Sequence, residues 1–147
     1  MNWMKKLGVL CAGLYLVGCQ TSGYMIEESN YSVKQHRIAI TQAMGPINTV
    51  SANGRELTSV YHDRSLKNIE VTPKVKERYY TKAIILGPRR PYRVSVVVKA
   101  EERDPDTGRF MEVGIEEDLS RRRALSILQM LNQSPAPSGI FDEEMPF

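Results

Sequence analysis

The chain of 147 residues is long enough for one domain with short tails, and 41% hydrophobic with 25% charged residues is the composition of a globular protein. This excludes a disordered or collagen-like chain. It also excludes a multi-pass membrane protein, because only the first twenty residues or so contain a long apolar run. The 20 basic and 17 acidic residues, a net charge of +3, are too evenly balanced for a typical nucleic-acid-binding protein.

Residues 1–18 have the pattern of a signal peptide. Lys5 and Lys6 form a positive start, and the mostly apolar segment 7–18 follows. This segment is too short to cross a bilayer as a permanent helix, but it has the length of a signal-peptide core. We therefore expect residues 1–18 to be removed from the mature protein.

The segment ends in Leu16, Val17, Gly18 and Cys19. After a charged start and an apolar core, this tetrapeptide resembles the lipobox of bacterial lipoproteins. The resemblance implies cleavage before Cys19, a diacylglycerol on its sulfur and an acyl chain on its amine, which together anchor a protein stably. Gln20, in place of an aspartate, implies sorting to the outer membrane, and we expect the domain to face the periplasm. The alternatives are an ordinary secretory signal and a buried N-terminal helix with a chance cysteine.

Cleavage before Cys19 would also remove Cys11, so the mature chain could form neither a disulfide nor a cysteine metal site. We expect no cofactor other than the lipid on Cys19. Residues 19–30 are polar without periodicity and predict a tether. Residues 133–147 include a proline-rich linker and predict a flexible tail. These boundaries place a single folded domain at 31–132.

The first element, over residues 32–44, is ambiguous from its pattern. Ser32 and Gln35 have the spacing of a capping box, and Gly45-Pro46 is a firm stop, so a helix is favoured. Apolar or aromatic residues also alternate with polar neighbours over 36–40, as they would in a strand. We favour the helix and leave the strand as the alternative.

Asn53-Gly54 then predicts a hairpin that joins 47–52 to 55–62, because both residues accept a positive φ. A helix, a glycine-proline stop and a hairpin, in this order over 32–62, resemble small outer-membrane lipoproteins of the BamE/SmpA type. The resemblance implies a small accessory subunit of an envelope complex.

The remaining pattern predicts strands and a final helix. β-Branched and aromatic residues favour a strand within 74–86, a turn at 87–91, and a strand over 92–103 with alternate valines on one face. A compact turn at 104–108 predicts that 110–115 returns as an antiparallel partner. The apolar face of a helix over 119–131 is formed by Ala124, Ile127, Leu128 and Leu131.

These elements predict an α+β fold. We expect an antiparallel sheet of four to five strands with the C-terminal helix packed on one face. The N-terminal helix, if formed, is expected on the same face.

Two arginine clusters are candidates for partner binding: Arg89, Arg90 and Arg93, and Arg121, Arg122 and Arg123. Cations in the first turn of the last helix oppose its dipole. Ion pairs of Glu117 with Arg121 and of Asp118 with Arg122 would offset this cost locally. The alternative is an anionic partner: lipid headgroups, lipopolysaccharide phosphates or an acidic protein.

The C-terminal segment combines aromatic and acidic residues after a linker. It is either a disordered end or a docking motif anchored by Ile140, Phe141 and Phe147.

No catalytic motif is evident in the sequence. The two histidines, His36 and His62, lack metal-ligand spacing, and we expect ordinary surface or partly buried side chains. Asp104 and Asp106 fit a plain turn better than a calcium loop. We therefore expect a non-enzymatic, membrane-anchored scaffold or accessory subunit that binds an envelope protein and no nucleic acid or metal. The alternative is a lipoprotein that binds a lipid or a glycan.

Overall fold

Two long strands form the centre of the fold. β4 (Glu77–Leu86) and β5 (Tyr92–Arg103) pair antiparallel along their whole length. In both strands every second side chain is buried, because the alternation places the β-branched and aromatic residues on one face. The computed structural model describes residues 23–135, and all structural statements refer to this part of the chain.

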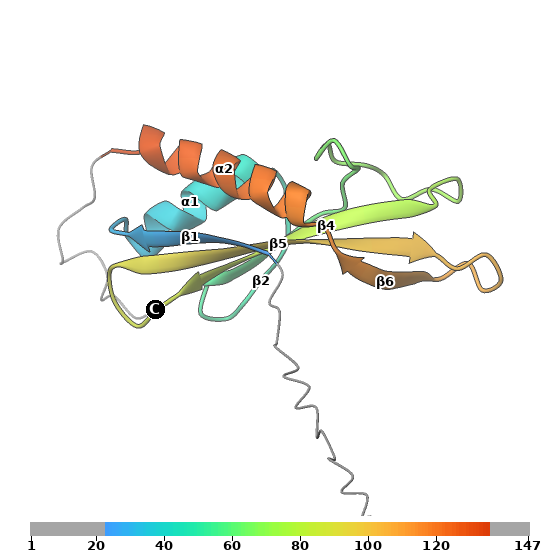
Figure 1. Cartoon of the computed structure of the whole chain (residues 1–147), viewed down its shortest axis with the longest axis horizontal. Coiled ribbons are helices and arrows are strands. Elements are labelled where there is room, and N and C mark those ends of the chain that lie inside the picture. The colour runs from blue at the N-terminus through green and yellow to red at the C-terminus, as the bar shows by residue number, and fades with distance from the viewer. Residues whose placement is uncertain (1–22, 136–147) are drawn as a thin grey trace, which may run out of the picture.

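The other strands complete a six-stranded antiparallel sheet (Figure 1). β3 (Glu56–Ser59) pairs with β4, and β2 (Ile47–Val50) pairs with β3 and lies at the edge of the sheet. β1 (Tyr24–Ser29) and β6 (Phe110–Ile115) both pair with β5. They lie end to end along one side of β5, since β4 occupies the whole of the other side.

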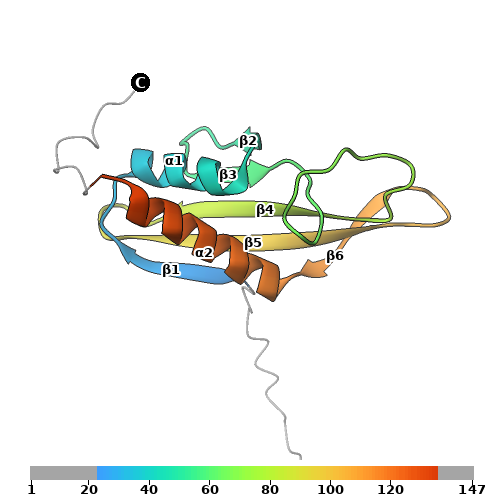
Figure 2. The same cartoon turned by 90° about the horizontal axis from the view of Figure 1, so that it is seen from above.

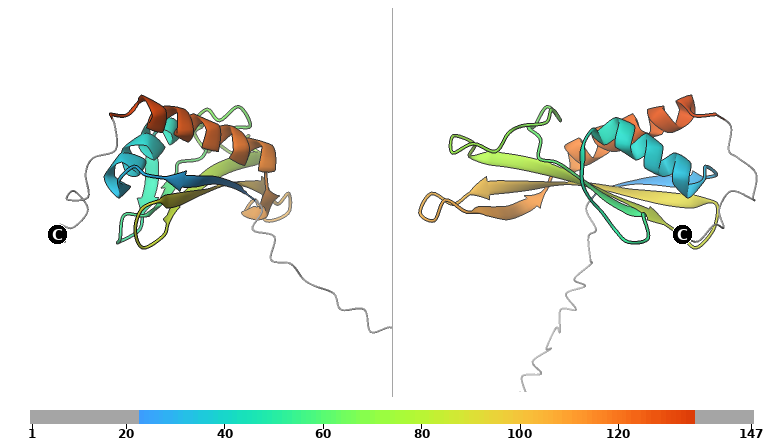
Figure 3. Two further views of the ribbon diagram at one scale, coloured as in Figure 1. Left: turned by 60° about the vertical axis from the view of Figure 1, so that its left-hand side comes forward. Right: turned by 180° about the vertical axis from the view of Figure 1, so that it is seen from behind.

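Two helices cover one face of this sheet, as seen from above in Figure 2 and from two further directions in Figure 3. They are α1 (Val33–Met44) and α2 (Glu117–Gln133), and they also contact each other. The predicted α+β class is therefore confirmed, with six strands instead of four to five.

The prediction of a tether over residues 19–30 is wrong for β1. Tyr24, Met25 and Ile26 pair with the first half of β5, and a register shift follows between Ile26 and Ser29. Glu28 has a positive φ of 45° within this irregular stretch. The shift interrupts the period-2 pattern, and this explains why the segment reads as polar and aperiodic.

The helix favoured over residues 32–44 is confirmed. The Ser32 hydroxyl accepts a hydrogen bond from the Gln35 N–H at 3.2 Å, and the Gln35 side chain accepts one from the Ser32 N–H at 2.9 Å. This reciprocal capping box starts α1. Gly45, with a φ of 75°, ends it in a conformation that favours glycine.

The hairpin at Asn53-Gly54 is confirmed, but its loop is longer than expected. Only Gly54 has a positive φ, at 66°. The Gly54 N–H donates to the Ser51 carbonyl at 2.8 Å, and the Ser51 N–H donates to the Glu56 carbonyl at 2.9 Å. The loop therefore spans 51–55, and Asn53 contributes through its side chain, which accepts hydrogen bonds from Ser51 and Arg55.

Helix α2 begins earlier than the pattern predicts. Its first turn contains Glu117 and Asp118, and this places the arginines 121–123 in the second turn. The predicted apolar face is wrong at Leu128, which is 38% exposed, while the adjacent face buries Arg123. The acidic first turn favours the helix dipole, so the expected cost of cations there does not arise.

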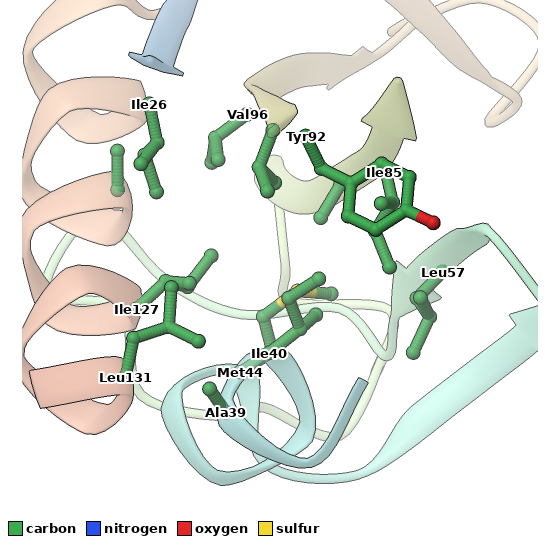
Figure 4. Packing of buried hydrophobic residues seen from close by; sticks show 13 residues of the cluster. Ile26, Ala39, Ile40, Met44, Leu57, Ile85, Tyr92, Val96, Ile127 and Leu131 are labelled. Carbon is green, nitrogen blue, oxygen red and sulfur yellow. The ribbon is translucent and has the colours of Figure 1, made fainter. Parts of the chain in front are cut away.

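The space between sheet and helices is filled by side chains. Figure 4 shows Ile40 and Met44 of α1 and Ile127 and Leu131 of α2 directed toward the sheet, where Val96 lies opposite. All five side chains are at most 2% exposed. Burial of this layer provides most of the stabilisation of the fold.

Candidate interaction site

A groove of about 450 Å³ lies between α1 and the β2–β3 hairpin, at the edge of the sheet. Ile47 and Leu57 line it, and Ile38 and Val50 also border it with 46% and 47% of their surfaces exposed. These two exposed side chains come from different elements and share one concave surface. An exposed concave apolar surface of this kind is typical of a site that binds another chain.

Two cations border the same groove. Lys34 and Arg37 project from α1, and both are exposed. The Arg37 guanidinium extends to the hairpin and lies next to Gly54: a Cβ atom placed on Gly54 would be 3.1 Å from Arg37 Nη1. Within residues 23–135, no acidic side chain forms an ion pair with Lys34 or Arg37. The groove therefore combines apolar side chains with two positive charges that have no acidic partner in the described domain.

The backbone of β2 adds a third recognition element. β2 pairs with β3 on one side only, and it is the last strand in the sheet order on this side. An edge strand presents N–H and C=O groups that can pair with an extended peptide. Three of its four residues are exposed. The edge of β2 and the adjacent groove could thus hold one extended chain segment.

The sheet face opposite the helices has a different character. Three ion pairs cross neighbouring strands on it: Lys82–Glu56 and Arg78–Glu101 at 2.6 Å, and Lys99–Glu112 at 2.9 Å. The hydrogen bond from Lys99 lowers the pKa of Glu112. Burial, reinforced by a hydrogen bond to Glu112, raises the pKa of Tyr80 to about 12. The charges of these three pairs balance each other, so the pairs add little net charge that could attract a partner.

Arg78 is held especially closely on this face. Its guanidinium carbon lies 3.7 Å from the ring centre of Tyr61 and 3.8 Å from that of Phe110, in addition to its ion pair with Glu101. A cation between two aromatic rings and a carboxylate contributes to the fold more than an exposed ion pair does. We assign Arg78 a structural role.

The first predicted arginine cluster lies at the turn between β4 and β5, at the same end of the molecule as the C-terminal end of α2 (Figures 1 and 2). Arg89 and Arg93 are exposed, and Arg90 is half-buried. Arg55 lies at the same turn, where its Nη1 donates to the Gly87 carbonyl at 2.5 Å and its guanidinium stands over Tyr92. Arg55 could not be assigned to this site from the sequence, because it lies far from the turn along the chain.

The second predicted cluster does not form one surface. Arg121 and Arg122 are exposed, whereas Arg123 is only 5% exposed. Arg123 Nη1 donates to the Ala43 carbonyl at 2.5 Å and Nη2 to the Leu66 carbonyl at 3.4 Å. Burial, with a smaller effect of the neighbouring Arg122 charge, lowers the pKa of Arg123. The prediction that Arg123 binds a partner is therefore wrong: its guanidinium is used inside the fold.

The expected ion pairs along α2 are also not formed. Within the described residues, Glu117 makes no ion pair with Arg121, nor Asp118 with Arg122. Arg121 and Arg122 therefore stay available to a partner, at the opposite end of α2 from the β4–β5 turn (Figure 1).

Both histidines are fully buried, deeper than expected. His36 Nε2 lies 2.7 Å from the Ser29 hydroxyl. His62 Nδ1 lies 2.9 Å from the Asp63 carbonyl, which can only accept, so this nitrogen carries the proton and Nε2 accepts from Thr81. Burial lowers the pKa of His62. Each ring therefore connects two segments of the fold by hydrogen bonds: His36 connects α1 to β1, and His62 connects the loop after β3 to β4.

The loop at Asp104 is a turn, as predicted. The Asp104 carboxylate accepts hydrogen bonds from the N–H groups of Asp106 and Thr107 at 2.8 Å, and these bonds lower its pKa. Across residues 23–135 there is no group of three or more His, Cys, Asp or Glu side chains arranged to hold a metal ion. The same part of the chain contains no helix long and apolar enough to span a bilayer.

Four predicted site residues lie outside the described part of the chain: Cys19, Ile140, Phe141 and Phe147. The groove residues themselves were not singled out from the sequence. The one available signal was Ile38, which falls outside the apolar face of the helix predicted over 32–44.

Comparison of the chain with known protein families, with curated proteins and with solved structures finds no match.

Proposed function

We propose that this protein is a non-enzymatic lipoprotein of the outer membrane that faces the periplasm and acts as an accessory or scaffold subunit of an envelope complex. In this proposal Cys19 carries the lipid anchor, and the groove between α1 and the β2–β3 hairpin receives a segment of a partner protein. The resemblance of residues 16–19 to a lipobox supports the anchor.

The observation that carries the proposal is the position of β1. The first strand begins at Tyr24, so only residues 20–23 separate it from Cys19. Fully extended, this connection spans about 16 Å. A lipid on Cys19 would therefore hold the domain close to the headgroups, where it could present its groove to a neighbouring membrane-bound subunit. A long tether would instead suit a domain that reaches far from the membrane.

The anchor is tested by fractionation of cells that express Cys19→Ala. We expect the variant to keep its fold and to lose its association with the outer membrane. Cys11→Ala is the matched control, because this cysteine would leave with the signal peptide, and its fractionation should not change. A Cys19→Ala variant that stays in the outer-membrane fraction would contradict the anchor.

Partner recognition is tested by photo-crosslinking in cells, with the crosslinker at Val50 and, as control, at Leu125 of α2. Val50 is 47% and Leu125 46% exposed, so the two positions differ in place and not in accessibility. We expect one stoichiometric envelope protein at Val50 that is lost in Ile38→Glu. Lipid or glycan in native mass spectrometry, without a protein partner, would instead support the ligand-binding alternative.

A further inference from the structure

The groove has a complement in this chain's own sequence. Residues 140–147 combine four hydrophobic side chains with three consecutive acids, Asp142, Glu143 and Glu144. The groove combines the exposed Ile38 and Val50 with Lys34 and Arg37, which have no acidic partner within residues 23–135. The C-terminal segment and the groove are thus complementary: both have apolar side chains, and the acids of the segment have the opposite charge to the cations of the groove.

The described chain ends close to this groove. The Pro135 carbonyl accepts a hydrogen bond from the Gln35 side chain at 3.2 Å, so the chain leaves α2 beside the first turn of α1. Figure 2 shows the C-terminal end of α2 next to the N-terminal end of α1. Lys34 precedes Gln35, and Ile38 lies one turn further along α1. Fully extended, residues 136–139 can span about 16 Å, and a helix with its side chains is about 10 Å wide, so Ile140 can reach the groove side of α1.

The alternation of side chains supports an extended docked segment. With a period of two, Phe141, Glu143, Met145 and Phe147 would share one side, so that aromatic side chains and one carboxylate could face the groove together. The edge of β2 offers backbone groups to such a segment.

We propose that residues 140–147 dock in the groove of the same molecule, with their aromatic side chains against Ile38 and Val50 and their carboxylates near Lys34 and Arg37. The segment then covers the groove and the edge of β2 until a partner displaces it. This inference rests on neither the lipid anchor nor the identity of a partner. A linker this short gives an effective concentration on the order of millimolar, so a weak contact suffices to keep the groove occupied.

The natural chain has a single tryptophan, Trp3. In the full-length protein, Trp3→Phe combined with Phe141→Trp makes the reporter at position 141 unique, whether or not the signal peptide is removed. We expect blue-shifted emission and weak quenching by acrylamide, both independent of protein concentration. In a background of Ile38→Glu, or of Lys34→Glu with Arg37→Glu, the emission should shift to that of an exposed indole, with several-fold stronger quenching.

The matched controls are Leu125→Glu and Arg122→Glu, which change exposed residues of α2, and both should leave the emission unchanged. Far-UV circular dichroism of every variant shows whether the domain is folded. An exposed indole in the Trp3→Phe, Phe141→Trp protein would overturn the proposal. A buried indole whose emission does not change with the groove substitutions would overturn it as well. A blue shift that grows with protein concentration would indicate that the segment docks in the groove of a second copy, and this would also overturn the proposal. None of these fluorescence results depends on membrane fractionation, so a failure of this proposal can be distinguished from a failure of the proposed lipid anchor.

Discussion

Arg123 connects three segments that are far apart in the sequence, and Arg123→Ala tests what its buried guanidinium contributes. The side chain extends from α2 to the Ala43 carbonyl at the end of α1 and to the Leu66 carbonyl in the loop between β3 and β4. The carbonyls at a helix end have no partner inside the helix, and a cation there also faces the negative end of the dipole. The alanine variant removes both interactions and the packing of the side-chain stem.

The magnitude follows from these contacts. The bond to Ala43, at 2.5 Å, is charge-assisted and contributes about 1.5–3 kcal/mol, whereas the 3.4 Å contact with Leu66 contributes little. Each buried methylene of the stem adds about 0.8 kcal/mol. Burial of a charge without an acidic partner opposes these gains, and the Nε atom has no hydrogen-bond partner in the described structure. We expect Arg123→Ala to lower the free energy of unfolding by about 2–3 kcal/mol.

Urea unfolding and thermal melting followed by far-UV circular dichroism measure this loss. In a domain of this size, 1 kcal/mol corresponds to a change of about 4 °C in Tm, so the expected decrease is about 10 °C. Arg122→Ala, one residue away and exposed, should change stability by less than about 0.5 kcal/mol. Arg123→Met keeps the stem and should recover only the packing part. A loss below about 0.5 kcal/mol in Arg123→Ala, or full recovery in Arg123→Met, would refute the argument that the guanidinium caps α1.

Three further predictions concern the pH dependence, the hairpin and the core. Burial lowers the pKa of His62 below 6.5, so the unfolded chain binds this proton more readily than the folded one. The free energy of unfolding should therefore decrease as the pH is lowered from 6.5 toward the pKa of the folded state, by at most about 1.4 kcal/mol per pH unit. Urea titrations at several pH values measure this slope, which should diminish in His62→Asn. Gly54→Ala should cost more stability in thermal melts than Gly108→Ala, because both glycines have a positive φ but only Gly54 has an arginine against it; equal losses would count against the packing of that arginine on the hairpin. Ile127→Ala should cost about 2–5 kcal/mol and Leu128→Ala well under half as much, because Ile127 is fully buried and Leu128 is 38% exposed; similar midpoints in urea would contradict the assigned orientation of α2.

The sequence determined those features that a few neighbouring residues decide. The capping box at Ser32 and Gln35, the glycine that ends α1, the hairpin at Gly54 and the turn at Asp104 were all predictable. In each of them a side chain satisfies a nearby backbone group, or a glycine adopts a conformation that other residues disfavour. The alternate valines of β5 likewise identify its buried face, because the period of a strand is fixed by its geometry.

The tertiary structure decided what depends on a distant partner. β1 is a strand because β5 supplies its hydrogen bonds, although its own pattern is interrupted. Arg123 is buried because the end of α1 and the loop at Leu66 provide carbonyls for it, and nothing near it in the sequence indicates this. The groove exists because α1 crosses beside the edge strand β2 and leaves Ile38 and Val50 on one surface. Pairing, burial and surface shape are properties of segments brought together in space, and a local pattern does not contain them.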